Sequence, residues 1–163
     1  MSRLRSATLV HEGGMRFAAT TGSSRTIVYG DAFAHNELSP VETLVVSLAA
    51  CSAMDVIAIA AKKRQEIDRY AVHVEADQRD EYPQVLTHVR VVHEVEGPGV
   101  DEAAIRRAIE LSATKYCPVN AMISAGPTEV HHAYRVIRTG ENAFDEEGEV
   151  VVTGPYRKPD AIG

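Results

Sequence analysis

Residues 39–64 decide the fold, and they read SPVETLVVSLAACSAMDVIAIAAKKR. Ser39, Pro40 and Glu42 match an N-cap, a first helical residue and the third position of a capping box, so a helix begins here. The rest of the stretch is apolar almost throughout, and a helix that is apolar on nearly every side is buried on most sides. A chain of 163 residues can scarcely enclose such a helix alone. We therefore expect a second copy of the chain to cover part of it.

The same stretch is long enough to raise the question of a membrane span, for which about 20 apolar residues suffice. Glu42 and Asp55 argue against a span, because an ionisable group in the bilayer interior costs several kcal/mol. The sequence also starts without an apolar signal region. We therefore expect a cytoplasmic protein with no membrane partner.

Composition is that of an ordinary globular protein. The 163 residues are 45% hydrophobic and 25% charged, enough for one domain with a sizeable core. Lys and Arg total 17 against 23 Asp and Glu, a net charge of −6, which argues against nucleic acid as the main partner. Much of the acidity lies after residue 138. We expect a domain over residues 1–138 and an acidic extension over 139–163, flexible or carrying a short strand at 149–153.

Eight further segments have the pattern of a strand or a helix. Those with strand character are residues 4–11, 16–20, 26–29, 70–77, 85–95 and 130–136. Those with helical spacing are residues 101–116 and 118–123. The alternation on either side of Pro83 predicts an antiparallel hairpin. The order of the segments predicts an α+β fold with a largely antiparallel sheet and a long buried central helix.

The two cysteines favour buried thiols or a working redox pair over a structural disulfide. Cys51 lies midway along the predicted helix, where packing is the ordinary role of a small side chain. A reactive Cys51 would need a cation from elsewhere in the fold or from a partner chain. Cys117 precedes Pro118, at the predicted N-cap of the short helix, where backbone N–H groups and the helix dipole favour a thiolate. A plain capping or packing role for Cys117 is an equal alternative.

The seven histidines do not predict a metal site. His131 and His132 are adjacent on a strand, so they face opposite sides of the sheet. His73 and Glu75 share a strand face, but two ligands are too few for a metal centre. The serine hydrolase motif Gly-x-Ser-x-Gly is absent from the sequence. We expect no metal and no cofactor.

Two segments resemble the cysteine motifs of the OsmC/Ohr family, the osmotically inducible and organic hydroperoxide resistance proteins. The first is SPVETL at residues 39–44 with AACSAMDV at 49–56, and the second is LSATKYCPV at 111–119. The resemblance covers about residues 3–138 and is strongest to the general OsmC-like branch. It implies an intertwined α+β homodimer, with two long helices buried at its centre and active sites at the subunit interface.

The resemblance also implies a chemistry. In the peroxidase members the first cysteine attacks a hydroperoxide and becomes a sulfenic acid, and the second resolves it to a disulfide. Carried over, Cys51 is the nucleophile and Cys117 the resolving thiol, and an external dithiol reduces the disulfide. The expected function is thiol-dependent reduction of organic hydroperoxides in oxidative-stress defence.

An arginine and a glutamate activate the first cysteine in the peroxidase members, and this chain departs from that pattern. The family's glutamate follows the helix proline directly, where this chain has Val41. Glu42 is one residue on, about 100° around the helix, and it is also the capping-box residue. The arginine comes from the N-terminal strands, where Arg16 is the first candidate and Arg25 the second. The expected catalytic residues are Cys51, Cys117, Glu42 and Arg16.

The departure leaves a second function open. This is a non-catalytic stress protein that binds a small apolar ligand at the dimer interface, with its thiols as sensors. The presence of both cysteines favours the peroxidase, whereas Val41 in place of the glutamate favours the binding protein.

Overall fold

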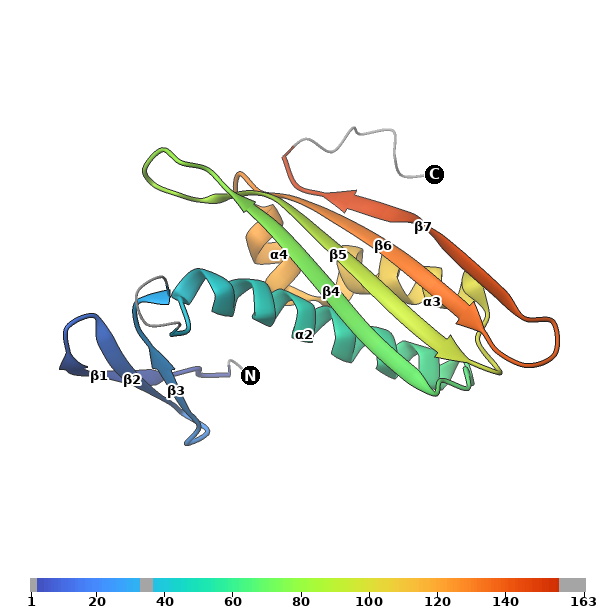
Figure 1. The fold of residues 1–163 in the computed structure, drawn as a ribbon, viewed down its shortest axis with the longest axis horizontal. Coiled ribbons are helices and arrows are strands. Elements are labelled where there is room, and N and C mark those ends of the chain that lie inside the picture. Colours follow the sequence, from blue (N-terminus) through green and yellow to red (C-terminus); the bar gives the residue numbers. More distant parts are fainter. Residues whose placement is uncertain (1–2, 33–36, 156–163) are drawn as a thin grey trace. The chain divides into compact units, whose positions relative to one another are not determined.

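The structure is a computed structural model that describes residues 3–32 and 37–155. The chain forms two compact units, residues 1–44 and residues 45–163. The first unit holds an antiparallel sheet in the order β1-β2-β3 (Figure 1). Its strands are β1 (Ala7–Gly13), β2 (Arg16–Thr21) and β3 (Thr26–Tyr29). Three predicted strands are confirmed here.

Helix α2 (Pro40–Lys62) has the start that its sequence predicts. The Ser39 N–H donates to Glu42 Oε2 at 2.8 Å, and the Glu42 N–H donates to Ser39 Oγ at 3.1 Å, which completes the capping box. Within one chain α2 buries a single stripe of side chains: Leu48, Ser52, Val56 and Ala60. Several apolar side chains of α2 stay exposed: Leu44, Val46, Met54 and Ile57. One chain therefore covers only part of the helix that the sequence predicts to be buried.

By length and composition alone, α2 could also cross a membrane. Its middle, however, carries polar side chains that are paired within the protein. Ser52 Oγ lies 3.1 Å from His93 Nε2 of the sheet, and Asp55 Oδ2 accepts a hydrogen bond from Ser112 at 3.0 Å. Polar groups paired in this way are typical of a core helix, since they would be costly in hydrocarbon.

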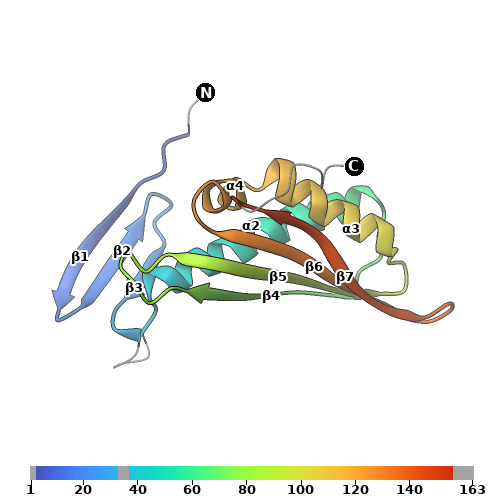
Figure 2. The ribbon, with the colours of Figure 1, turned by 90° about the horizontal axis from the view of Figure 1, so that it is seen from above.

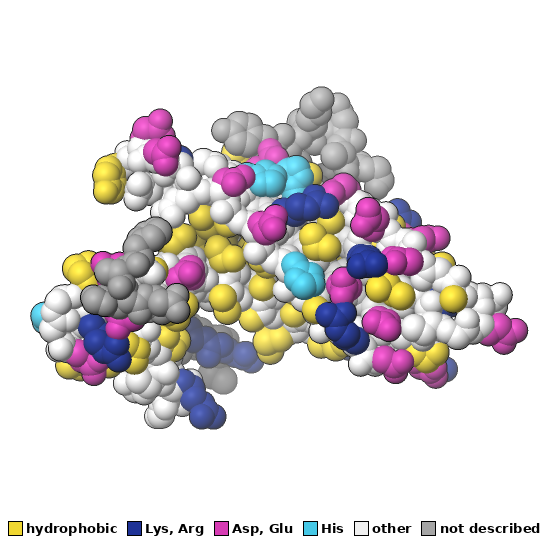
Figure 3. All heavy atoms as spheres, in the orientation of Figure 1, with side chains coloured by type: hydrophobic (Ala, Val, Ile, Leu, Met, Phe, Trp, Pro, Cys, Tyr) yellow, Lys and Arg dark blue, Asp and Glu magenta, His cyan; other side chains and the backbone are white. Residues whose placement is uncertain are grey.

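Residues 45–163 are built on a four-stranded sheet in the order β4-β5-β6-β7. Its strands are β4 (Arg69–Gln78), β5 (Leu86–Gly97), β6 (Glu129–Arg138) and β7 (Phe144–Thr153). The outer pairs β4–β5 and β6–β7 are antiparallel, and the central pair β5–β6 is parallel. The helices lie on one face of this sheet (Figures 1 and 2), and charged side chains of both signs cover the other face (Figure 3). The predicted α+β fold with largely antiparallel sheets is confirmed.

The core of this unit lies between the sheet and helix α3 (Glu102–Leu111). The Asp101 side chain caps α3 by accepting from the Ala104 N–H at 2.9 Å. The cluster is made of apolar side chains from α2, α3, β5, β6 and the connection between β5 and α3: Val56, Ala60, Val95, Val100, Ile105, Ala108, Ile109, Tyr134 and Val136. After α3 the chain continues as a π-helical turn, η1 (Ser112–Tyr116), and the short helix α4 (Pro118–Ser124). The predicted helix over residues 101–116 is thus an α-helix only as far as Leu111.

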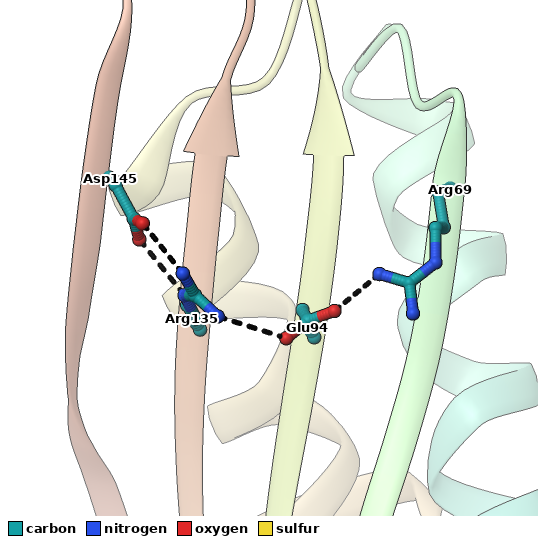
Figure 4. Close-up of polar contacts among 4 residues, drawn as sticks. All are labelled: Arg69, Glu94, Arg135 and Asp145. Carbon is teal, nitrogen blue, oxygen red and sulfur yellow. Dashed lines mark hydrogen bonds and ion pairs between the residues drawn. The ribbon is translucent and has the colours of Figure 1, made fainter.

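Strand β7 corrects the expectation for the acidic extension. We expected a flexible segment with at most a short strand at residues 149–153, but Phe144–Thr153 pairs with β6. Ion pairs join one charged side chain on each of the four strands, in the order Arg69, Glu94, Arg135 and Asp145 (Figure 4). Opposite charges on neighbouring strands stabilise a sheet by about 0.2–1 kcal/mol per pair. Asp145 of the acidic segment therefore helps to hold β7 against β6. Residues 156–163 lie outside the described residues.

Candidate active site

Cys51 and Cys117 are 66 positions apart in the sequence and lie side by side in the structure. Their Sγ atoms and a carboxylate oxygen of Asp55 all lie within 4.8 Å of one another. Neither cysteine is in a disulfide. Cys51 is partly buried, and Cys117 is only 3% exposed. Small side-chain movements would bring the sulfurs to the ~2.05 Å of a disulfide bond, so the arrangement can work as a reversible redox pair.

A π-helical turn places Cys117 beside α2. The Cys117 N–H donates to the Ser112 carbonyl, five residues back, at 2.9 Å. Cys117 then takes an extended backbone (φ −74°, ψ 104°) and becomes the N-cap of α4, with its Sγ accepting from the Asn120 N–H at 3.3 Å. The predicted N-cap position is confirmed. Nothing in the sequence signals the π-turn, which brings both Ser112 and Cys117 against α2.

Burial decides the protonation of Cys117. It raises the pKa of the Cys117 thiol to about 12, and the neighbouring Cys51 thiol and the charge of Asp55 add to the rise. The Asn120 N–H lowers the pKa, but by less than burial raises it. The expectation that the helix N-terminus favours a thiolate at Cys117 is therefore wrong, and the alternative of a plain capping and packing role fits better. Cys117 is a protonated thiol at neutral pH, because the loss of water outweighs the cap.

A chain of polar contacts runs from Asp55 through the core to the sheet. Ser112 Oγ lies 3.0 Å from Asp55 Oδ2 and 3.4 Å from Ser52 Oγ. Ser52 Oγ lies 3.1 Å from His93 Nε2, and His93 Nδ1 lies 2.7 Å from the Tyr70 hydroxyl. Ser52, Ser112 and His93 are fully buried. Sequence reasoning missed this chain because its members come from α2, η1, β4 and β5, which meet only in the folded protein.

Asn120 ties the Cys117 segment to the last two strands. Its Nδ2 donates to the Ala113 carbonyl at 2.8 Å and lies 3.2 Å from Thr153 Oγ1, while its Oδ1 lies 3.0 Å from His132 Nε2. Because an amide oxygen only accepts, this assignment puts the His132 proton on Nε2. Nδ1 of His132 has no partner among the described residues. Asn120 itself is 1% exposed, so water does not compete for these bonds.

Acid should destabilise the protein through its two buried histidines. Burial lowers the pKa of His93 to about 3 and that of His132 to about 4. Both are therefore neutral in the folded protein, whereas in the unfolded chain they take up a proton near pH ~6.5. Their contribution to the stability of the folded protein is complete above that pH, and it is lost as the pH falls toward the pKa values of the folded protein. The free energy of unfolding should fall by up to about 1.4 kcal/mol per pH unit for each histidine.

Urea denaturation at pH 7, 6 and 5 measures this slope. We expect His132→Gln to flatten it, because glutamine offers no site that protonates on unfolding. His73→Gln is the matched control, since His73 is exposed on the sheet. Equal slopes in the His132→Gln variant and the unmodified protein would show that His132 is not the source of the acid sensitivity.

Arg16 has a different glutamate partner from the one that the sequence suggested. On β2 it pairs with Glu12 at 3.0 Å and with Glu37, which lies just before α2. Glu42 is held in the capping box, whose hydrogen bonds from Ser39 keep the pKa of Glu42 below its ordinary value. The carboxylate of Glu37 lies against Gly30, where a Cβ would be 1.5 Å from Glu37 Oε2. No sequence motif marks Glu37 as the partner of Arg16.

The four expected catalytic residues are divided between the two units. Arg16 and Glu42 belong to residues 1–44, and Cys51 and Cys117 to residues 45–163. The structure brings the two cysteines together and pairs Arg16 with Glu12 and Glu37. It assigns Glu42 a structural place at the start of α2.

Two groups of side chains in the described part of the chain could hold a metal ion. One is the two-cysteine site with Asp55. The other joins His88 of β5 to Glu129 and His131 of β6, with ligand atoms within 4.8 Å of one another. His88 lies directly opposite Glu129 in the parallel β5–β6 register. This second group could not be predicted from the sequence, because the register of a parallel pair cannot be read from alternation within one strand.

Known proteins resemble the chain in sequence and in fold. A family model of OsmC-like proteins matches residues 33–132. Protein YhfA of Escherichia coli strain K12 is 32% identical over 124 residues, which are 76% of this chain and 92% of YhfA. An OsmC-like protein from Mycoplasma pneumoniae has the same fold, with a TM-score of 0.72 and 17% identity over 83% of this chain and 99% of that one. An organic hydroperoxide resistance protein from Elizabethkingia anophelis has a TM-score of 0.64 and 14% identity, over 85% and 99% of the two chains. The chain therefore belongs to the OsmC-like protein family.

Proposed function

We propose that this protein reduces organic hydroperoxides with Cys51 and Cys117 and so takes part in oxidative-stress defence. The observation that carries the proposal is the pair of neighbouring thiols, whose sulfurs lie within 4.8 Å of each other. Membership of the OsmC-like family supports it, because an organic hydroperoxide resistance protein shares the fold.

Cys51 is the nucleophile in this proposal. It is partly exposed, so a hydroperoxide can reach it, whereas Cys117 is buried and protonated. The Cys51 thiolate attacks the distal oxygen, the O–O bond breaks, and the alkoxide takes up the proton that the Cys51 thiol released. Cys51 becomes a sulfenic acid, and Cys117 displaces its hydroxyl group as water to form the disulfide. An external dithiol, available in a reducing compartment such as the cytoplasm, restores both thiols.

We assign the activating cation to Arg16. A thiolate nucleophile needs positive charge beside it, and the family pattern takes that charge from an arginine of the N-terminal strands. Arg16 is held on β2 by its ion pairs with Glu12 and Glu37. Glu37 then orients the arginine in place of Glu42, which caps α2.

The exposed face of α2 supports a homodimer. Val46 and Met54 are 60% and 70% exposed, Leu44 and Ile57 of the same helix are exposed as well, and several exposed apolar side chains on one helix favour an interface. A second copy laid on this face would bury it and would enclose apolar space for the organic part of a hydroperoxide. The molar mass in solution tests this pairing, and a value of one chain, 17.7 kDa, would contradict it. The same apolar face favours the second function, binding of a small apolar ligand with the thiols as sensors.

Stopped-flow mixing of the reduced protein with cumene hydroperoxide separates the two functions. We expect the loss of two thiols per chain at a rate well above that of a free thiol. Arg16→Met should slow this reaction, and Arg25→Met, on an exposed turn before β3, is the matched control. A reaction no faster than that of a free thiol would contradict the peroxidase and leave the ligand-binding function.

A further inference from the structure

The carboxylate of Asp55 lies at the two cysteines and has no part in the steps above. It follows Cys51 by one turn of α2, and one of its oxygens lies within 4.8 Å of both sulfurs. A partly buried carboxylate is costly unless it is hydrogen-bonded. Ser112 supplies such a bond at 3.0 Å. Since a carboxylate can accept about four hydrogen bonds, Asp55 keeps acceptor sites for the neighbouring thiols.

A series of four polar contacts lies behind Asp55. They join Asp55, Ser112, Ser52, His93 and Tyr70 in that order. Ser112 Oγ is placed to donate to either Asp55 or Ser52, but its single proton serves one acceptor at a time, and the shorter contact, 3.0 Å against 3.4 Å, is the one to Asp55. Ser52 and His93 are fully buried behind Ser112, so Ser112 is held where it can donate to Asp55.

The bond from Ser112 holds the Asp55 side chain in a fixed position beside the two sulfurs. Tyr70 keeps its proton, since burial and the charge of Asp55 raise its pKa. His93 stays neutral because it is fully buried. A carboxylate held in this way can take a proton from a neighbouring thiol and return to the same state.

We infer that Asp55 carries the proton of Cys117 while the disulfide forms. The inference rests on the proposed function and concerns its second step. The S–H bond of Cys117 breaks, the proton passes to Asp55, and the Cys117 sulfur attacks Sγ of the Cys51 sulfenic acid. The S–O bond breaks as the S–S bond forms, and the leaving hydroxide takes the proton from Asp55 and departs as water. No proton or electron is left over, and Asp55 is a carboxylate again.

Cys117 needs a proton carrier because it is buried. A protonated thiol is a weak nucleophile, and at 3% exposure Cys117 has little access to water that could take its proton. Hydroxide is also a poor leaving group until it is protonated. Asp55 is a weak base, but the final acceptor of the proton is hydroxide, so Asp55 holds the proton only in transit.

Asp55→Asn separates the two steps of the reaction. The amide has the shape of the carboxylate and still accepts from Ser112, but it cannot take up the proton. Trapping with dimedone measures formation of the Cys51 sulfenic acid, and loss of the second thiol measures disulfide formation. We expect sulfenic acid to form at least as fast as in the unmodified protein, and the disulfide about 100-fold more slowly. Asp55→Glu, which keeps a carboxylate, should restore part of the second rate.

Ser112→Ala tests the hydrogen-bond chain as a positioning device. It should slow only disulfide formation, by about tenfold, so that sulfenic acid accumulates. Thr114→Ala is the matched control, since Thr114 is an exposed residue of the same π-helical turn. Disulfide formation at the unmodified rate in both Asp55→Asn and Ser112→Ala would overturn the role of Asp55 and leave the peroxidase standing. Failure of the unmodified protein to form a sulfenic acid would overturn both.

Discussion

Cys51→Ser should abolish the consumption of hydroperoxide, with a loss of at least about 100-fold in rate. A serine hydroxyl keeps its proton at neutral pH and does not attack a peroxide oxygen. Cys117 cannot take over, because it is 3% exposed and its pKa is raised to about 12. The measurement is the rate of cumene hydroperoxide loss in the presence of a dithiol.

Cys117→Ser is the matched variant for the same assay. It should react once with hydroperoxide at an unchanged rate and stop at the Cys51 sulfenic acid, because no resolving thiol remains. The two variants therefore fail at different steps. Unchanged consumption in Cys51→Ser would end the proposed mechanism, whatever the behaviour of Cys117→Ser.

Asn120→Ala should lower the free energy of unfolding by about 3 kcal/mol. The substitution leaves the buried Ala113 carbonyl and the His132 Nε2–H without their partner and removes the contact with Thr153 of β7. Each buried polar group left unpaired costs about 1–3 kcal/mol. Asn120 is thus the side chain that holds the Cys117 segment against β6 and β7.

Urea denaturation measures this loss. The matched control is Met122→Ala in the same short helix, which should cost less than about 0.5 kcal/mol because Met122 is 69% exposed. Disulfide formation should also slow in Asn120→Ala, since the turn that presents Cys117 loses its anchor. A loss of stability equal to that of the Met122→Ala control would contradict the role given to Asn120.

The features that the sequence predicted well depend on residues close together in the chain. The start of α2 follows from Ser39 and Glu42, three positions apart, and the N-cap at Cys117 follows from the adjacent Pro118. The alternation of β5 likewise needs no partner strand to be recognised. Strand β7 was expected only in part, as a short strand at residues 149–153, for the opposite reason. Its acids meet their arginines only in the register with β6, and from composition alone they indicated a flexible extension.

In the candidate site, too, local features could be predicted from the sequence and contacts between distant residues could not. The two cysteines were expected together only through the resemblance to a family, because 66 positions separate them. The helix cap lowers the pKa of Cys117, and burial raises it by more. The cap can be predicted from neighbouring residues, whereas burial depends on the whole fold. Glu37 pairs with Arg16 although 21 positions separate them. His93 of β5 joins the polar contacts behind Asp55 through Ser52 of α2, 41 positions away. Local chemistry was therefore readable from the sequence, and pairing across elements was not.

A peptide map after oxidation tests the redox pair most directly. One equivalent of cumene hydroperoxide is added to the reduced protein, the remaining thiols are alkylated, and the digested peptides are identified by mass spectrometry. We predict a Cys51–Cys117 disulfide as the main product, with both thiols lost together and both recovered after treatment with a dithiol. Two results would contradict the account. One is an overoxidised Cys51 together with a fully alkylated Cys117, and the other is alkylation of both cysteines with the hydroperoxide unreacted.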